Sequence, residues 1–362
     1  MKSIENLYNE IIQNPQKWVY WNYNEDISKK VNEILPNFSS LFVQNSGEKL
    51  IKLLLHIGEK NNGVLVSNIE KLSPERKRHI VSLFFIGHIL YEHIDIIKEK
   101  INLQLENLIF PKQEEKVDTQ KLFSFFWLLL CLFHDLGYGY EDGIVVVESD
   151  LSIEEIYKKL KKEFYPNIYN VENLNRHNNY RLCKWGVKDH GIWGGKVFFN
   201  DMLQIKDYLQ QKYITDKTCV FCIGDVDYIY AYAAWIIMCH NLRYDDGRSD
   251  YTSCFKCQHL DDFIKPKARC ISLKSNPLLF LFCLADTIEP TKALYSLKKG
   301  VDNDRNICKL LELKFEGNTM SFNLSKLVDY TVGEKYKNEI VLSMNDWLID
   351  VSKDLVINFE CE

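Results

Sequence analysis

The sequence has no dense block of lysine and arginine, and its 362 residues carry a formal net charge of -5. A protein that binds extended nucleic acid neutralises many phosphates with clustered basic side chains, so extended nucleic-acid binding is not expected here. A local basic pocket for one small phosphate ligand remains compatible with this charge. The chain also has no internal repeat and no low-complexity tract, and 46% hydrophobic with 26% charged residues is an ordinary globular balance.

Long apolar runs are missing as well. The longest uncharged apolar runs, residues 122–133 and 228–239, are too short to cross a bilayer, and each leads into a histidine. We interpret both as buried helices and expect no membrane partner. The chain does not open on the pattern of a secretory signal, and residues 1–13 predict an amphipathic helix instead, so we expect a cytoplasmic protein.

The eleven cysteines lack the density and regular spacing of a secreted disulfide framework, which favours reduced thiols. One segment, "CFKCQHL", has the C-x2-C spacing of two zinc thiolates on a tight turn. It predicts a candidate structural zinc site, and the alternative is a reduced, partly buried cysteine pair in a loop. The candidate zinc ligands are Cys254, Cys257, His259 and Cys270.

Helical patterns dominate the chain as far as about residue 295, because apolar residues recur at spacings of three and four between capping residues. Asn276 and Pro277 mark the start of one such helix, and Pro290 closes it. Another helix opens at Asp189. The remaining predicted helices cover residues 46–60, 74–102, 120–135, 152–164 and about 225–242.

The pattern changes after residue 305. In "KLLELKFEGNTMSFNLS", apolar residues alternate on either side of Gly317-Asn318, which predicts a β-hairpin. We therefore expect a mainly α protein with a small C-terminal α+β appendage. The expected domains are a helical extension over residues 1–70, a helical domain over 71–300 and the small α+β region over 301–362.

The apolar run that ends at Phe133 is followed at once by His134 and Asp135. A buried ionised carboxylate costs several kcal/mol unless a partner compensates its charge, and a metal ion is one such partner. Four further segments carry similar residues on, or at the end of, predicted helices: "FFIGHILYEH" with His88, "KDHGIWGG" with His190, "IIMCHNLR" with His240 and "FCLADTIEP" with Asp286.

Helices packed side by side can bring such groups together in a bundle core. Imidazoles and carboxylates without thiolate suit Mn, Fe, Mg or Zn more than a soft metal. Any single histidine can instead be a hydrogen-bonded core residue. That second interpretation is the one we give to His56, His79, His93 and His177.

The ordered series His88, His134-Asp135 and Asp286 resembles the signature of the HD superfamily of metal-dependent phosphohydrolases, in which four such residues hold one metal in an all-helical domain. "CLFHDLGYG" and "FCLADTIEP" read much as those motifs usually do. The resemblance covers residues 80–295, and His190 and His240 are similar to the additional histidines of the bimetallic phosphodiesterase branch, which includes the HD-GYP enzymes.

The resemblance implies an all-helical HD-domain core with two divalent metal ions. Asp135 would bridge the two metals. His88, His134 and Asp286 would complete the first site, and His190 and His240 would belong to the second. His134, Asp135 and Asp286 would then be the central catalytic residues.

The chain departs from the HD-GYP branch at three positions. Tyr138 stands where that branch usually has lysine after "HDxG", His240 is followed by Asn241 where the branch has paired histidines, and "DHGIWGG" stands where the GYP tripeptide would be. The cyclic di-GMP specificity of that branch is therefore not carried over to this chain.

The ligand types suggest a reaction. Two divalent cations about 4 Å apart lower the pKa of a shared water, and the hydroxide so formed attacks phosphorus. We expect a phosphohydrolase acting on a nucleotide-like phosphodiester or phosphoester. Two alternatives stay open, namely a nucleoside triphosphohydrolase with one metal and a regulatory module that binds a nucleotide without turnover. A homo-oligomer is compatible with the sequence.

Two further features lie beside the motifs. Gly191, Gly194 and Gly195 have no side chains, so either another helix or a phosphate can approach the backbone closely at these positions. Asp189 can cap the helix that His190 begins. Among the basic residues nearby, we select Arg181 and Lys292 as candidate substrate-binding residues for phosphate oxygens.

Overall fold

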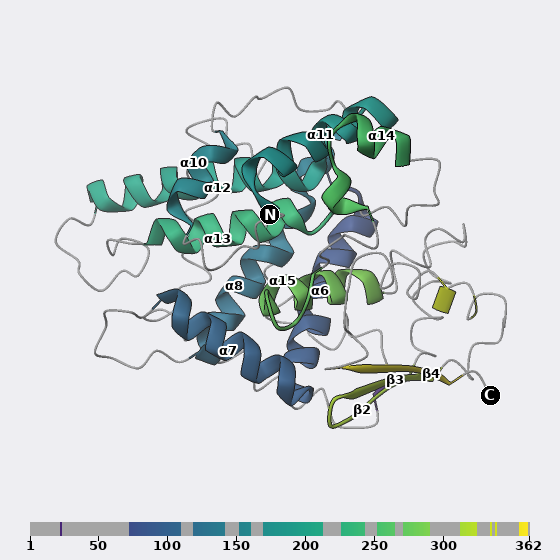
Figure 1. Cartoon of the computed structure of the whole chain (residues 1–362). Coiled ribbons are helices and arrows are strands. Elements are labelled where there is room, and N and C mark those ends of the chain that lie inside the picture. The colour runs from purple at the N-terminus through teal and green to yellow at the C-terminus, as the bar shows by residue number, and fades with distance from the viewer. Residues whose placement is uncertain are drawn as a thin grey trace. The chain divides into compact units, whose positions relative to one another are not determined.

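The computed structural model describes residues 22–23, 72–109, 119–141, 152–160, 169–212, 226–242, 252–264, 271–289, 312–323, 334, 337–338 and 355–360. Over these residues the protein is mainly α-helical, as the sequence predicts, with one small sheet (Figure 1). None of the described helices combines the length and the apolar composition needed to span a membrane. The helices predicted over residues 1–13 and 46–60 lie outside the described residues.

The chain divides into two compact units, and the predicted domain of residues 71–300 contributes to both. The first unit contains residues 106–269. Its described elements are α8 (Thr119–Phe133), the 3-10 helix η1 (His134–Gly137), α9 (Tyr138–Glu141), α10 (Ile153–Lys159), α11 (Val171–Trp185), α12 (His190–Lys212), α13 (Val226–Cys239), α14 (Thr252–Cys257) and the 3-10 helix η5 (Asp261–Phe263).

Two helices of the first unit are apolar on all sides. Residues 126–133 of α8 and residues 231–239 of α13 are fully buried, as predicted for a helix without a polar face. α12 packs along α13 and against η1 (Figure 1). These contacts bring the ends of α8 and α13 to the beginning of α12.

Local signals explain where several helices of this unit begin. Ser152 and Glu155 form a reciprocal capping box at the start of α10. Asp189 caps α12, because its Oδ1 accepts a hydrogen bond of 3.0 Å from the Ile192 amide, and the predicted cap is thereby confirmed. The predicted helix of residues 152–164 ends earlier, at Lys159.

Asp227 in the first turn of α13 ties together three helices of the first unit. Its carboxylate forms ion pairs with Lys206 of α12 and, at 3.0 Å, with Lys159 of α10. Burial by itself raises the pKa of Asp227, but the hydrogen bonds and charges of the two lysines outweigh burial and lower it. Asp227 therefore stays ionised at neutral pH and holds the three helices together.

The second unit contains residues 74–105 and 270–362 together with residues 9–36. Its described elements are β1 (Asn22–Tyr23), α6 (Pro74–His93), α7 (Asp95–Ile109, as far as Leu105), α15 (Pro277–Ile288), β2 (Glu312–Glu316), β3 (Thr319–Asn323) and β4 (Val356–Glu360). The sequence predicts one helix over residues 74–102, but the structure has two helices there, because Ile94 between them is not helical. α6 packs against α15, which begins at Pro277 as predicted.

The sheet of the second unit has the strand order β1-β2-β3-β4. Strands β2 and β3 form the predicted hairpin, with Glu316 opposite Thr319 and a positive φ of 58° at Gly317. β4 lies parallel to β3, and β1 lies parallel to β2. The sheet of the predicted α+β region therefore also takes in a strand from residues 22–23.

Candidate metal centre

His134 and Asp135 lie in η1, directly after the buried helix α8. Both side chains are buried, and His134 Nε2 is 3.2 Å from Asp135 Oδ1. The other ring nitrogen, Nδ1, lies 3.0 Å from the carbonyl oxygen of Cys131. A carbonyl oxygen can only accept, so Nδ1 carries the proton and donates it. The Nε2 lone pair then faces the carboxylate, an arrangement that a cation or a proton would stabilise.

His240 follows α13 and is held in the same way as His134. Its Nδ1 lies 2.6 Å from the carbonyl oxygen of Ile237 and donates to it. Donation of one ring N–H to a carbonyl fixes the tautomer and leaves the Nε2 lone pair for a metal, which is the usual second contact of a metal-ligating histidine. The rings of His134 and His240 lie 5.3 Å apart.

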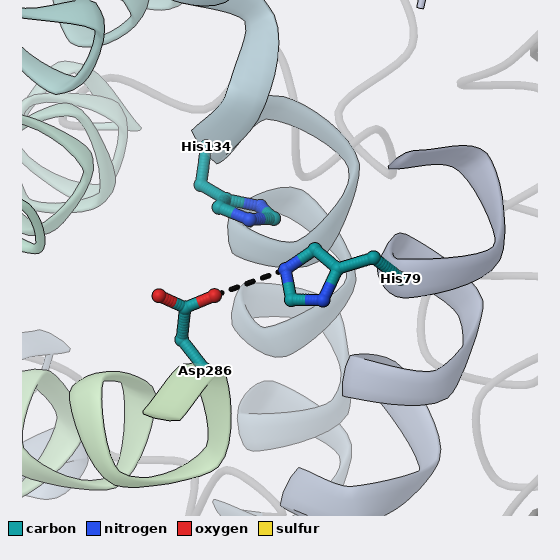
Figure 2. Close-up of side chains that lie close together, drawn as sticks. All are labelled: His79, His134 and Asp286. Carbon is teal, nitrogen blue, oxygen red and sulfur yellow. Dashed lines mark ion pairs between the residues drawn. The ribbon is translucent and has the colours of Figure 1, made fainter. Parts of the chain in front are cut away.

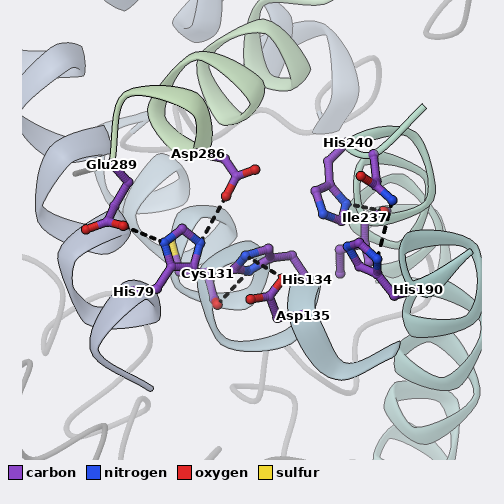
Figure 3. Close-up of polar contacts among 10 residues, drawn as sticks. His79, Cys131, His134, Asp135, His190, Ile237, His240, Asp286 and Glu289 are labelled. Carbon is purple, nitrogen blue, oxygen red and sulfur yellow. Dashed lines mark hydrogen bonds and ion pairs between the residues drawn. The ribbon is translucent and has the colours of Figure 1, made fainter. Parts of the chain in front are cut away.

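Asp135, His190 and His240 form a group that can hold a metal ion. One ligand atom from each of the three residues lies within 4.8 Å of the others, and all three residues are buried (Figure 3). The three side chains come from η1, α12 and the end of α13, which belong to one unit. The structure thus brings together three of the ligands predicted from sequence.

Three glycines explain how these segments come so close. A Cβ at Gly137 would lie 1.8 Å from the His190 carbonyl oxygen. At Gly191 it would lie 2.8 Å from the Ile237 carbonyl oxygen, and at Gly195 it would lie 2.5 Å from that of Ala234. The sequence left open whether the glycines of "GIWGG" admit a helix or a phosphate. In the structure, Gly191 and Gly195 admit α13.

In the second unit, His79 of α6 lies between two carboxylates of the α15 segment. Its Nε2 is 2.9 Å from Asp286 Oδ1, and its Nδ1 is 2.8 Å from Glu289 Oε2 (Figure 2 shows the pair with Asp286). All three residues are buried. Burial by itself lowers the pKa of His79, but the hydrogen bonds and charges of Asp286 and Glu289 outweigh burial and raise the pKa to about 9.

The sequence motifs predict His88 as the first ligand, but the structure places His79 beside Asp286. His88 lies nine residues further along α6, where its ring centroid is 4.6 Å from that of Phe84, and it lies outside the group of Asp135, His190 and His240. Burial lowers the pKa of His88 to about 3. We therefore interpret His88 as a neutral core histidine.

This interpretation predicts how stability depends on pH. His88 takes up a proton near pH 6.5 only when the chain unfolds, because its pKa in the folded protein is about 3. Stability from this group is therefore complete above pH 6.5 and falls by about 1.4 kcal/mol for each pH unit below it. His88→Gln should remove this part of the dependence, a difference of about 2 kcal/mol between pH 6.5 and pH 5 in urea denaturation. Equal pH dependence of the two proteins, or loss of bound metal in the variant, would contradict a core role.

The structure describes one of the two candidate substrate-binding residues, Arg181. Arg181 of α11 directs its Nε toward Asp189 Oδ2 at 3.6 Å, and its guanidinium lies 4.6 Å from the centre of the Trp185 ring. Asp189 precedes His190, so Arg181 lies close to the site but contacts a carboxylate of the protein. Lys292 lies outside the described residues.

The candidate zinc ligands do not form a group in the described part of the chain. Cys254 and Cys257 lie on α14, and Cys257 is exposed. His259 is exposed too, with a positive φ of 54°. None of the three belongs to a group of close ligand atoms among the described residues, and Cys270 lies outside them. The structural zinc stays a prediction.

In each unit, residues beside the candidate ligands were missed or were predicted to have another role. In the second unit, His79 and Glu289 were not assigned as partners of Asp286, although Glu289 follows Asp286 by three residues, a spacing that places both on one face of a helix. Asn241 contacts His190 Nδ1 at 3.3 Å, and the Tyr138 ring stacks on the His190 ring at 3.8 Å. No periodicity in the sequence indicates these last two contacts.

The chain matches no family model, no characterised protein and no solved structure in the comparisons. The chemical character of the site therefore comes from its own residues. Buried imidazoles and carboxylates without thiolate can bind a divalent metal ion such as Mn, Fe, Zn or Mg.

Proposed function

We propose that the protein is a metal-dependent phosphohydrolase that cleaves a phosphodiester or phosphoester bond in a nucleotide-like substrate. The observation that carries this proposal is the group of Asp135, His190 and His240, whose ligand atoms converge inside one unit. The resemblance of the sequence motifs to those of the HD superfamily suggests the reaction class, phosphoester hydrolysis. They also assign Asp286 to the same reaction, and His79 is the histidine with which Asp286 pairs.

The residues of this group fit a divalent metal ion. The buried Asp135 carboxylate needs a compensating positive charge, and the Nδ1 contact of His240 leaves its Nε2 lone pair available. His134, next to Asp135, is held in the same way by its Nδ1 contact. When bound, the metal supplies Lewis-acid chemistry and lowers the pKa of a water that can attack phosphorus.

The chain's own side chains contribute the remaining functions. Asp135 has two carboxylate oxygens and can contact two cations at once, which an imidazole nitrogen cannot. Its burial keeps bulk water away and strengthens every charge interaction at the site. The carbonyl contacts of His134 and His240 hold both rings in place before substrate binds, so that little reorganisation is needed.

The test is a turnover assay on the full chain after removal of metal with a chelator and reloading with Mn, Fe, Mg or Zn. Substrates would be cyclic mononucleotides, cyclic dinucleotides, nucleoside triphosphates and bis(p-nitrophenyl) phosphate. We expect turnover that requires added metal, with near two metals per chain by elemental analysis. Near one metal per chain together with triphosphate hydrolysis would favour the single-metal alternative. No turnover with any metal would overturn the proposal in favour of a binding module.

A further inference from the structure

The three histidines around Asp135 are not held alike. His134 and His240 each donate Nδ1–H to a backbone carbonyl three residues earlier, at 3.0 and 2.6 Å. Each ring therefore presents a lone pair at Nε2. The Nδ1 of His190 faces a side chain instead, at 3.3 Å from Asn241 Nδ2. Whether Nε2 of His190 carries a proton or a lone pair therefore depends on which atom of the Asn241 amide points toward the ring.

Asp189 decides the orientation of that amide. The Asp189 carboxylate is fully buried, and its Oδ2 lies 3.3 Å from Asn241 Nδ2 and 3.6 Å from Arg181 Nε. An ionised carboxylate only accepts hydrogen bonds, so the NH2 group of Asn241 must face it, whereas the amide oxygen would be repelled. The guanidinium of Arg181 has only N–H donors, so it also directs a donor toward this carboxylate.

This orientation determines the tautomer of His190. The Asn241 nitrogen has two hydrogens, of which one is donated to Asp189 and the other points at His190 Nδ1. Nδ1 must then accept, so the proton of the neutral ring lies on Nε2. The Tyr138 ring stacks on His190 at 3.8 Å with an interplanar angle of 18°, and this contact hinders a flip of the imidazole. Figure 3 shows His190 beside His240.

We propose that Asp189, acting through Asn241, holds His190 with its proton on Nε2, so that His190 donates a hydrogen bond to a phosphate oxygen of the substrate while Asp135 and His240 bind the metal. The inference rests on the proposed function and assigns separate roles within its group. A neutral imidazole can stabilise negative charge in this way without transferring a proton. In this scheme His190 is a catalytic residue, and Asn241 and Tyr138 are positioning residues.

The tautomer can be measured without any turnover. In the full chain labelled with 15N-histidine, long-range 1H–15N spectra distinguish a protonated ring nitrogen from one with a lone pair, and His190→Gln assigns the signals. Without metal, we expect His134 and His240 to carry the proton on Nδ1 and His190 to carry it on Nε2. On addition of Zn2+, the Nε2 signal of His240 should shift strongly, and His190 should keep its tautomer. A proton on Nδ1 of His190, or a shift of its Nε2 matching that of His240, would overturn the inference.

Two further measurements test the link to substrate. Dimethyl phosphate added to the Zn2+-loaded protein should shift the Nε2–H proton of His190 and leave that proton unchanged in Asn241→Leu. Asn241→Leu should also lower kcat by about 10- to 100-fold, the usual size of a positioning effect, with metal affinity unchanged. A 10- to 100-fold loss of metal affinity in this variant would instead make His190 a metal ligand and overturn the inference. Absence of all turnover would refute the proposed function alone, because the spectra still decide the tautomer.

Discussion

Asp135→Asn should lower metal-dependent phosphoester hydrolysis by at least about 100-fold, since metal-based stabilisation of a phosphoryl transition state is worth several kcal/mol. The substitution keeps the shape of the side chain and removes its charge. Asp135 is buried and shares its group with His190 and His240, and a neutral amide oxygen cannot supply the charge that the carboxylate offers a divalent cation. Steady-state kinetics with bis(p-nitrophenyl) phosphate and elemental analysis of the purified variant would measure both losses.

The same variant should keep its fold when metal is absent. A buried carboxylate is costly to desolvate, and an amide of the same shape avoids the cost of a buried charge while its oxygen can still accept a hydrogen bond. The free energy of unfolding of the variant should differ from that of the unchanged protein only when metal is present. A ligand at 100 times its Kd stabilises the folded state by about 2.7 kcal/mol, and the variant would lose that stabilisation. Asp201→Asn is the matched control, since Asp201 is a buried carboxylate on α12 that lies outside the group of Asp135, His190 and His240. Full activity of Asp135→Asn beside that control would rule out Asp135 as a catalytic ligand.

Gly137→Ala should be the most disruptive small substitution in the described part of the chain. The added Cβ would lie 1.8 Å from the carbonyl oxygen and 2.5 Å from the carbonyl carbon of His190, which are backbone atoms that cannot rotate away. Overpacking usually costs about 1–3 kcal/mol and occasionally more, and we expect at least the upper end of that range. Urea denaturation would measure the free energy of unfolding.

Gly194→Ala serves as the control for this effect. Its Cβ would meet Gly137 N at 3.3 Å and His134 O at 3.4 Å, contacts that a shift of a few tenths of an ångström relieves. Alanine also favours a helix over glycine by about 1 kcal/mol, which would offset much of the cost. We therefore expect a change of less than about 1 kcal/mol. Equal destabilisation by the two substitutions would show that close approach of η1 and α12 is not what requires Gly137.

The two predictions concern two residues of the same segment, η1. Asp135 contributes charge to the site, and Gly137, two residues later in η1, contributes the space that lets α12 approach. The HDLG segment thus joins a candidate ligand to the contact that places His190. This explains why a helix of apolar residues ends in polar groups at this point of the chain.

Much of the local structure could be predicted from periodicity and capping signals. The apolar runs of α8 and α13, the Asp189 cap and the hairpin at Gly317-Asn318 all follow from contacts between residues close in sequence. Predictions failed where a local signal was weak. The break at Ile94 has no proline or glycine to mark it, so residues 74–102 gave the pattern of one continuous helix.

The choice between His79 and His88 could not be made from the sequence. Both are buried histidines on α6, and each is surrounded by residues compatible with a helix. Only the packing of α6 against α15 decides that His79, and not His88, meets Asp286 and Glu289. The apolar neighbours of His88 lower its pKa, but they give no indication of which histidine of α6 faces α15.

The sequence by itself determined where the helices that lead to the candidate ligands lie, because hydrophobic periodicity and caps act over one or two helical turns. It also determined the mainly α class. The tertiary structure decided which of these residues meet, since Asp135, His190 and His240 are separated by 55 and 50 residues and converge only through the packing of α12 on η1 and α13. It also decided the hydrogen-bond partner of each imidazole, such as Asn241 or a backbone carbonyl. Such a contact depends on atomic positions to within a few tenths of an ångström, which no sequence pattern specifies.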